Sequence, residues 1–176
     1  MNHKKFLLTM VTLLILSLMS ASIATAGAPR STFSATAEMK EMIDPGTTEI
    51  RDNHVHVRGM KQAYETCWTY DASGETVCYR EVVEANVVIS LADMTGTMWG
   101  SFKFLDDNNA VVWKGKFHGS RRIIDENMVS TVTDIGLGQG PNEGLLFQYT
   151  LKAYNIWDPS QPATFAGKGF VQETSN

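Results

Sequence analysis

The chain has 176 residues, with 19 acidic and 15 basic side chains and a formal net charge of −4 at neutral pH. This acidic balance argues against a dedicated nucleic-acid-binding protein, which needs a basic surface to contact phosphates. Its 14 glycines and five prolines are ordinary numbers for a globular protein, so neither disorder nor a fibrous repeat is indicated.

Residues 1–26 have the three parts of a secretion signal in the expected order. Lys4 and Lys5 give a positive start, an apolar run spans 6–19, and Ala24-Thr25-Ala26 is a small-x-small cleavage site. The run of 14 residues is shorter than the roughly 20 that span a bilayer, and no cysteine lies near the cut to carry a lipid anchor. We therefore predict a secreted or periplasmic mature chain, 27–176, that is neither a lipoprotein nor inserted in a membrane.

The mature chain is predicted to form a single all-β domain. Short stretches of alternating apolar and polar residues are separated by turn-forming residues, and no stretch has the period of a helix. A chain of about 150 residues is long enough to bury a substantial core. The predicted strands lie near 31–42, 48–58, 60–70, 75–91, 96–105, 110–123, 128–135, 144–156 and 163–172.

The second predicted strand carries two alternating histidines, His54 and His56, with Arg58 on the same side. Two imidazoles at this spacing can share a metal ion, but the sequence offers no evident third ligand, and we predict no metal and no cofactor. We interpret these residues as a polar outer face opposite Val55 and Val57. Contact with a polar ligand is the alternative.

The strands 60–70 and 75–91 are predicted to form a hairpin that turns between Ala72 and Ser73. Because an oxidising compartment favours pairing of the only two cysteines, we predict a structural disulfide. A redox-active pair is disfavoured because the spacing is not C-x-x-C. The register places opposite-charge and Thr–Thr pairs across the strands, as sheets prefer: Cys67 faces Cys78, Thr69 faces Thr76, Glu65 faces Arg80, and Lys61 faces Glu84.

The strands 96–105 and 110–123 are predicted to form a second hairpin around the loop 106–109. The facing glycines of this register leave a gap in an aromatic wall, which we interpret as a site of sharp coiling, with room for a ligand as the alternative. The predicted pairs are Phe104 with Val111, Phe102 with Trp113, Gly100 with Gly115, and Met98 with Phe117.

The second strand of that hairpin has a basic outer face made of Lys114, Lys116 and His118. We interpret it as a solvated surface, and attraction of an anionic ligand, an envelope surface or a protein partner is the alternative. A loop at 125–127 places His118 opposite Asp134. A carboxylate beside an imidazole is part of a catalytic triad, but no nucleophile in a recognisable elbow completes it, so we predict a surface pair.

The glycine-rich segment Gly136–Gly144 is predicted to be a loop at a barrel mouth. It does not fit a phosphate-binding loop, because it precedes a strand rather than a helix and lacks the Gly-Lys-Ser/Thr ending.

Repeated glycines in consecutive strands, as in Phe117-His118-Gly119 and in the segment 165–170, predict strong curvature. We therefore expect a closed or nearly closed antiparallel β-barrel of about eight to nine strands, with the last strand closing against the first. The secretion signal, the meandering strands and the G-x-G-like strand ends resemble calycin-type barrels, and more narrowly the allene-oxide-cyclase and dirigent group with its bacterial relatives. The resemblance covers about 31–173. The resemblance implies a β-barrel fold and a relationship to a group that includes cyclising and stereochemistry-guiding proteins. It assigns no catalytic role to any residue of this chain.

The predicted function is non-catalytic binding of a small apolar molecule inside the barrel, because such sites are lined by aromatic side chains with a few polar groups. A protein-interaction module that uses the outer face is one alternative. An isomerase or cyclase is another, which needs polar groups inside the barrel, where the alternation places few. An oligomer is compatible with the sequence. The candidate ligand contacts are Phe102, Phe104, Trp113, Phe117, Phe147 and Tyr149, and the candidate polar or anion contacts are His54, His56, Arg58, Lys114, Lys116 and His118.

Overall fold

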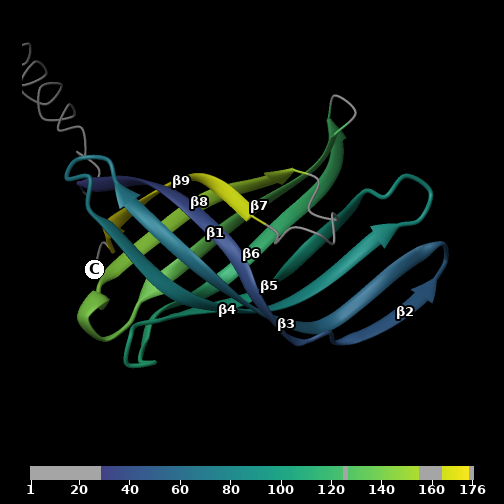
Figure 1. Cartoon of the computed structure of the whole chain (residues 1–176), viewed down its shortest axis with the longest axis horizontal. Coiled ribbons are helices and arrows are strands. Elements are labelled where there is room, and N and C mark those ends of the chain that lie inside the picture. Colours follow the sequence, from purple (N-terminus) through teal and green to yellow (C-terminus); the bar gives the residue numbers. More distant parts are fainter. Residues whose placement is uncertain (1–28, 125–126, 155–163, 175–176) are drawn as a thin grey trace, which may run out of the picture.

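The computed structural model describes residues 29–124, 127–154 and 164–174, and these form an antiparallel β-barrel (Figure 1). The predicted secretion signal, 1–26, lies outside the described residues. The strands are β1 (Arg30–Asp44), β2 (Thr47–Arg51), β3 (His54–Tyr70), β4 (Thr76–Ser90), β5 (Gly96–Leu105), β6 (Val111–Ile124), β7 (Asn127–Gly138), β8 (Leu145–Tyr154) and β9 (Thr164–Glu173).

Eight strands close the barrel in the order β1-β9-β8-β7-β6-β5-β4-β3, because β1 also pairs with β3. The ninth strand, β2, lies outside this ring and pairs with the beginning of β3. The all-β barrel and the pairing of the last strand with the first are thus confirmed. Among the described residues, the helical ones are the single 3-10 turn Gly140–Asn142, and no helix there is long and apolar enough to cross a membrane.

The prediction of one strand over 48–58 is wrong. Asp52 and Asn53 have φ values of 51° and 60°, the left-handed conformation that a two-residue hairpin turn requires and that Asp and Asn tolerate. The chain therefore reverses after β2, and β3 begins at His54. Gly59, with φ of 67°, lies in a β-bulge between Val57 and Met60 that lets β3 continue to Tyr70.

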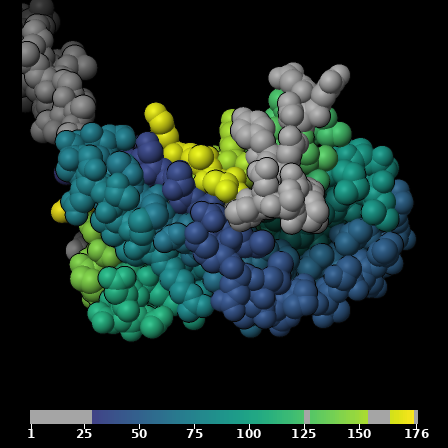
Figure 2. All heavy atoms as spheres, in the orientation of Figure 1, coloured from purple at the N-terminus to yellow at the C-terminus, as the bar shows by residue number. Residues whose placement is uncertain are grey.

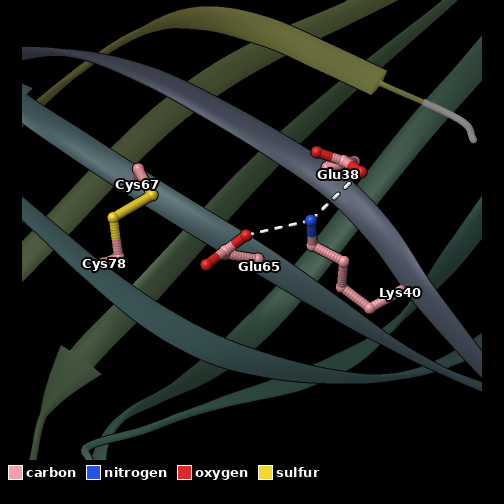
Figure 3. A network of polar contacts seen from close by, with 5 residues as sticks. All are labelled: Glu38, Lys40, Glu65, Cys67 and Cys78. Atoms are coloured by element: carbon pink, nitrogen blue, oxygen red, sulfur yellow. Dashed lines mark ion pairs between the residues drawn. A yellow bond between two sulfur atoms is a disulfide. The ribbon is translucent and has the colours of Figure 1, made fainter.

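The disulfide-bonded hairpin β3–β4 has the predicted register. Cys67 and Cys78 form a disulfide, and the hydroxyls of Thr69 and Thr76 share a hydrogen bond of 2.9 Å. Glu65 lies opposite Arg80, as predicted, but its ion pair is with Lys40 of β1, which also contacts Glu38 (Figure 3). All of these charged groups are exposed, so water screens each ion pair and it contributes little to the stability of the fold.

The predicted register of the β5–β6 hairpin is wrong by two residues. A bulge beside Leu105 pairs Phe104 with Trp113, Phe102 with Gly115, Gly100 with Phe117, and Met98 with Gly119. A shift of two residues keeps every side chain on its predicted face, but each glycine now faces an aromatic ring instead of another glycine. The predicted gap in the aromatic wall therefore does not exist.

An aromatic core fills one end of the barrel, at the left of Figure 1, where the β3–β4 turn lies. Trp68 is fully buried at its centre, stacked on Phe33 at 4.5 Å between ring centroids and edge-on to Phe147 at 4.8 Å. Such ring pairs contribute roughly 0.5–1.5 kcal/mol each beyond the burial of their area. We call this cluster the aromatic plug: Phe33, Trp68, Phe102, Phe104, Trp113, Phe147 and Tyr149.

Candidate functional site

The other end of the barrel holds a cavity of about 350 Å³. This end lies at the right of Figure 1, where the β2–β3 and β4–β5 hairpins turn. The space-filling view shows β2 and the beginning of β3, in blue, as an outer wall of this end (Figure 2). A volume near 350 Å³ lies within the range of small-molecule sites in proteins. The barrel is thus filled at one end and hollow at the other.

The walls of the cavity are mostly apolar and come from all eight strands of the barrel. Four methionines contribute, and their flexible thioether side chains adapt to guests of different shapes. Strand β4 contributes every second residue from Glu81 to Ile89, because alternate side chains of a strand share a face. The apolar lining is Ala37, Met39, Met42, Val57, Met60, Val83, Ala85, Val87, Ile89, Met98, Phe117, Val132, Leu151 and Phe165.

Several exposed apolar side chains lie at the end of the barrel that holds the cavity. They belong to the end of β1, to β2, to the β4–β5 turn and to the end of β6, and the most exposed, Ile50, has 68% of its surface accessible. This apolar rim consists of Met42, Ile43, Ile50, Leu91, Met94, Ile123 and Ile124.

Glu81 is a buried carboxyl group at the inner end of the cavity. It is 4% exposed and lies opposite Phe104 of the aromatic plug and Tyr64 of β3. The hydroxyl of Thr66 donates a hydrogen bond of 2.6 Å to its Oε2. Burial, reinforced by the negative charge of Asp134, raises the pKa of Glu81 to about 8, and the hydrogen bond from Thr66 opposes this rise.

Asp134 is the second buried carboxyl group of the cavity. The predicted pairing with His118 is wrong by one residue: Asp134 lies opposite Phe117 and Tyr149, and His118 lies opposite Thr133. A shift of one residue moves a side chain to the other face of the sheet, so Asp134 points into the barrel and is 4% exposed. Burial raises the pKa of Asp134 to about 7, although the neighbouring Tyr149 hydroxyl acts in the opposite direction.

Glu81 and Asp134 together make the inner end of the cavity a site for positive charge or for donated hydrogen bonds. Tyr64 lines the same cavity, and burial, reinforced by the negative charges of Glu81 and Asp134, raises the pKa of its hydroxyl. Arg121 lines the cavity too and is 5% exposed. It lies four residues further along β6 than Phe117, the partner of Asp134, and its backbone is hence about 13 Å further along the strand, in the direction of the mouth.

Most of the predicted aromatic contacts lie away from the cavity. Phe117 lines it, whereas the other five residues belong to the aromatic plug, where they pack against one another. Their proposed role as ligand contacts therefore receives no support from their positions. These five are Phe102, Phe104, Trp113, Phe147 and Tyr149.

The predicted polar contacts lie on the outside of the barrel. His54 and His56 have ring centroids 6.3 Å apart on the face of β3 opposite Val57, a cavity residue. In the described part of the chain, no group of three histidine, cysteine or acidic residues is arranged to hold a metal ion. Arg58 is exposed on the same strand. The roles of these residues in binding stay predictions.

The basic outer face of β6 exists as predicted: Lys114, Lys116 and His118 are exposed and alternate with inward-facing residues. The prediction of a loop over 136–144 is wrong for its first three residues, because β7 continues to Gly138. The Phe147 ring covers Gly136, where a side chain would collide with it. The remaining loop, 139–144, lies at the plug end of the barrel and not at the mouth of the cavity.

Sequence reasoning missed both buried carboxyl groups, although a signal for one of them was present. The correct β3–β4 register places Cys78 and Arg80 outside, so that Glu81 must share the inner face with Tyr79 and Val83. No comparable signal existed for Asp134, because its face depends on the β6–β7 register, which the turn residues alone did not determine.

Comparison of the chain with protein-family models, with curated proteins and with solved structures gives no significant match. The resemblance to the allene-oxide-cyclase and dirigent group therefore stays a prediction, and the barrel itself rests on the strand pairings described above.

Proposed function

We propose that this barrel binds a small, largely apolar molecule in the cavity at its open end. The supporting observation is an unfilled space of about 350 Å³ that apolar side chains from all eight barrel strands surround. Folded proteins pack their interiors densely, and a fold that closes one end with the aromatic plug leaves the other end hollow. The apolar rim would offer such a guest a route of entry.

A cavity-filling substitution tests this proposal. Ala85 is 4% exposed and lines the cavity, so Ala85→Phe places a ring where the guest would lie. We expect it to weaken binding of 4-phenylbutanol, measured by calorimetry, by at least roughly tenfold. Val87→Trp, at a second lining position, should do the same.

Ser101→Phe is the matched control, because Ser101 is exposed on the outer face of β5 and its replacement leaves the cavity unchanged. Native mass spectra of the protein purified from an exporting host provide a second measurement, in which a guest appears as extra mass that denaturation removes. The proposal is overturned if the protein carries no guest and if Ala85→Phe, Val87→Trp and Ser101→Phe all bind the alcohol as the unmodified chain does.

Catalysis on the guest is the second candidate function. The carboxyl groups of Glu81 and Asp134 face the cavity with pKa values of about 8 and 7, and groups that titrate near neutral pH are suited to general acid–base chemistry. They are the inward polar groups that an isomerase or cyclase requires. Chemical analysis of a copurified guest before and after renewed incubation with the protein separates conversion from simple binding.

A further inference from the structure

Two carboxyl groups lie at the inner end of an apolar cavity, where each must either keep its proton or gain a partner of opposite charge. Glu81 and Asp134 are each 4% exposed, and an ionised carboxylate without a partner is costly to bury. The ion pairs that join two described residues lie between exposed side chains, and neither Glu81 nor Asp134 takes part in them. The Thr66 hydroxyl donates one hydrogen bond to Glu81 but brings no charge.

The chemistry of this inner end distinguishes between classes of guest. An anionic head group would meet two acidic side chains. A neutral hydroxyl would gain hydrogen bonds but no charge compensation. An ammonium group would supply three donors and the missing positive charge, and charge-assisted hydrogen bonds are about twice as strong as neutral ones. The apolar walls between the mouth and the carboxyl groups fit a hydrocarbon or aromatic body.

We propose that the cavity binds an apolar amine, with its ammonium group between Glu81 and Asp134 and its apolar body against the methionine-rich walls. This inference rests on the proposed function, since it names the chemical class of the guest for the same cavity. Arg121, nearer the mouth, is compatible with such a guest because the register separates it from Asp134 by four residues along the strand.

Three probes with one apolar body test the proposal: 4-phenylbutylamine, 4-phenylbutanol and 4-phenylbutyrate, each titrated calorimetrically into the purified protein. We expect the amine to bind at least roughly tenfold more tightly than the alcohol, and the carboxylate to bind most weakly. Glu81→Gln and Asp134→Asn should each weaken amine binding by a similar factor while leaving the alcohol nearly unaffected. Glu84→Gln, on the outer face of the same strand as Glu81, should change neither.

The amine should also bind more tightly as the pH rises from 6 to 8. An alkylammonium ion stays charged below about pH 10, whereas the carboxyl pair loses protons in this interval, so the ammonium ion replaces a proton on binding. Calorimetry in buffers of different ionisation enthalpy should detect the released proton. Within the described part of the chain, the titratable groups that face the cavity are Tyr64, Glu81, Arg121 and Asp134, with Tyr149 beside Asp134.

The outcomes separate this inference from the proposed function. If amine and alcohol bind equally well, and Ala85→Phe blocks both, the amine inference fails while binding in the cavity stands. If Glu81→Gln and Asp134→Asn leave amine binding unchanged, the amine inference also fails. If none of the three probes binds and no guest copurifies, both proposals fail.

Discussion

At the scale of single residues, the inward or outward direction of one side chain determines what the barrel interior can do. Asp134 on the outer face would be an ordinary surface partner of His118, but in the observed register it faces the cavity with Glu81. Burial changes the proton affinity of both groups. Each is more easily protonated in the folded barrel than in the unfolded chain, and this difference couples the stability of the fold to pH.

Stability should therefore fall as the pH rises. The pKa of Glu81 increases from an ordinary value of 4.5 to about 8, and that of Asp134 from 3.8 to about 7. Between the ordinary and the raised pKa values, the folded state keeps protons on these two carboxyl groups that the unfolded state has lost. Their contribution to the stability of the fold is therefore fully present below about pH 4 and is lost by about pH 8. The free energy of unfolding, from urea denaturation between pH 5 and pH 8, should fall by roughly 1 kcal/mol or more per unit of pH.

Glu81→Gln should make this slope shallower, because it removes one titrating group, and it should be more stable than the unmodified protein near pH 8. Gln at this position can still accept the hydrogen bond from Thr66. The control Glu84→Gln, on the outer face, should leave the slope unchanged. Parallel pH profiles for Glu81→Gln and the unmodified chain would contradict a buried, proton-binding Glu81.

At the scale of strands, glycines and aromatic rings interlock across neighbouring partners. Gly100 lies opposite Phe117, Gly115 opposite Phe102, and the Phe147 ring covers Gly136. Each ring packs over the bare backbone of the glycine on the neighbouring strand and occupies the space that a side chain would take. Such aromatic–glycine pairs help to fix the register of neighbouring strands. This interlocking explains why the β5–β6 register differs by two residues from the predicted one.

Gly100→Ala tests this interlocking. A Cβ atom at this position would collide with the backbone oxygen of Glu84 and would lie 2.7 Å from Cε1 of Phe117, so both the neighbouring backbone of β4 and the ring would have to move. We expect a loss of about 1–3 kcal/mol in the free energy of unfolding, as for other overpacked interiors. Ser101→Ala, one residue further on the exposed face, should change stability by about 0.5 kcal/mol or less. Equal stability of the two variants would mean that neither the ring nor the neighbouring backbone of β4 requires a glycine at this position.

At the scale of the whole molecule, the barrel divides into an end that stabilises the fold and an end that is free to bind. The aromatic plug concentrates ring contacts around Trp68 and Phe147. The cavity end has flexible methionines and an exposed apolar rim. The two buried carboxyl groups lie where the two ends meet, because Glu81 is opposite Phe104 and Asp134 is opposite Tyr149.

Substitutions in the plug should therefore lower stability without changing the affinity of the cavity. Phe147 is fully buried, and Phe147→Ala should lower the free energy of unfolding by about 3–5 kcal/mol, as for other large-to-small changes in a core. Calorimetric titration of the folded variant with 4-phenylbutanol should give the affinity of the unmodified protein. A parallel loss of affinity would show that the two ends do not act independently.

The sequence by itself determined the features that depend on neighbouring residues. Alternation predicted the all-β class and most strands, and glycine-rich strands predicted the closed barrel. Opposite charges, threonines and cysteines predicted the β3–β4 register, because cross-strand pairs of that hairpin are few and chemically distinct. Those same pairs were sufficient to place Glu81 on the inner face.

Only the tertiary structure decided the registers of β5–β6 and β6–β7, and with them the site. Strands rich in glycine and aromatic residues allow several registers with similar local pairings, and the packing of rings against distant strands selects one of them. A slip of one residue changed the face of Asp134, and the size of the cavity depends on how eight strands close around it. Both are properties of the closed barrel, since no single hairpin contains the contacts that determine them.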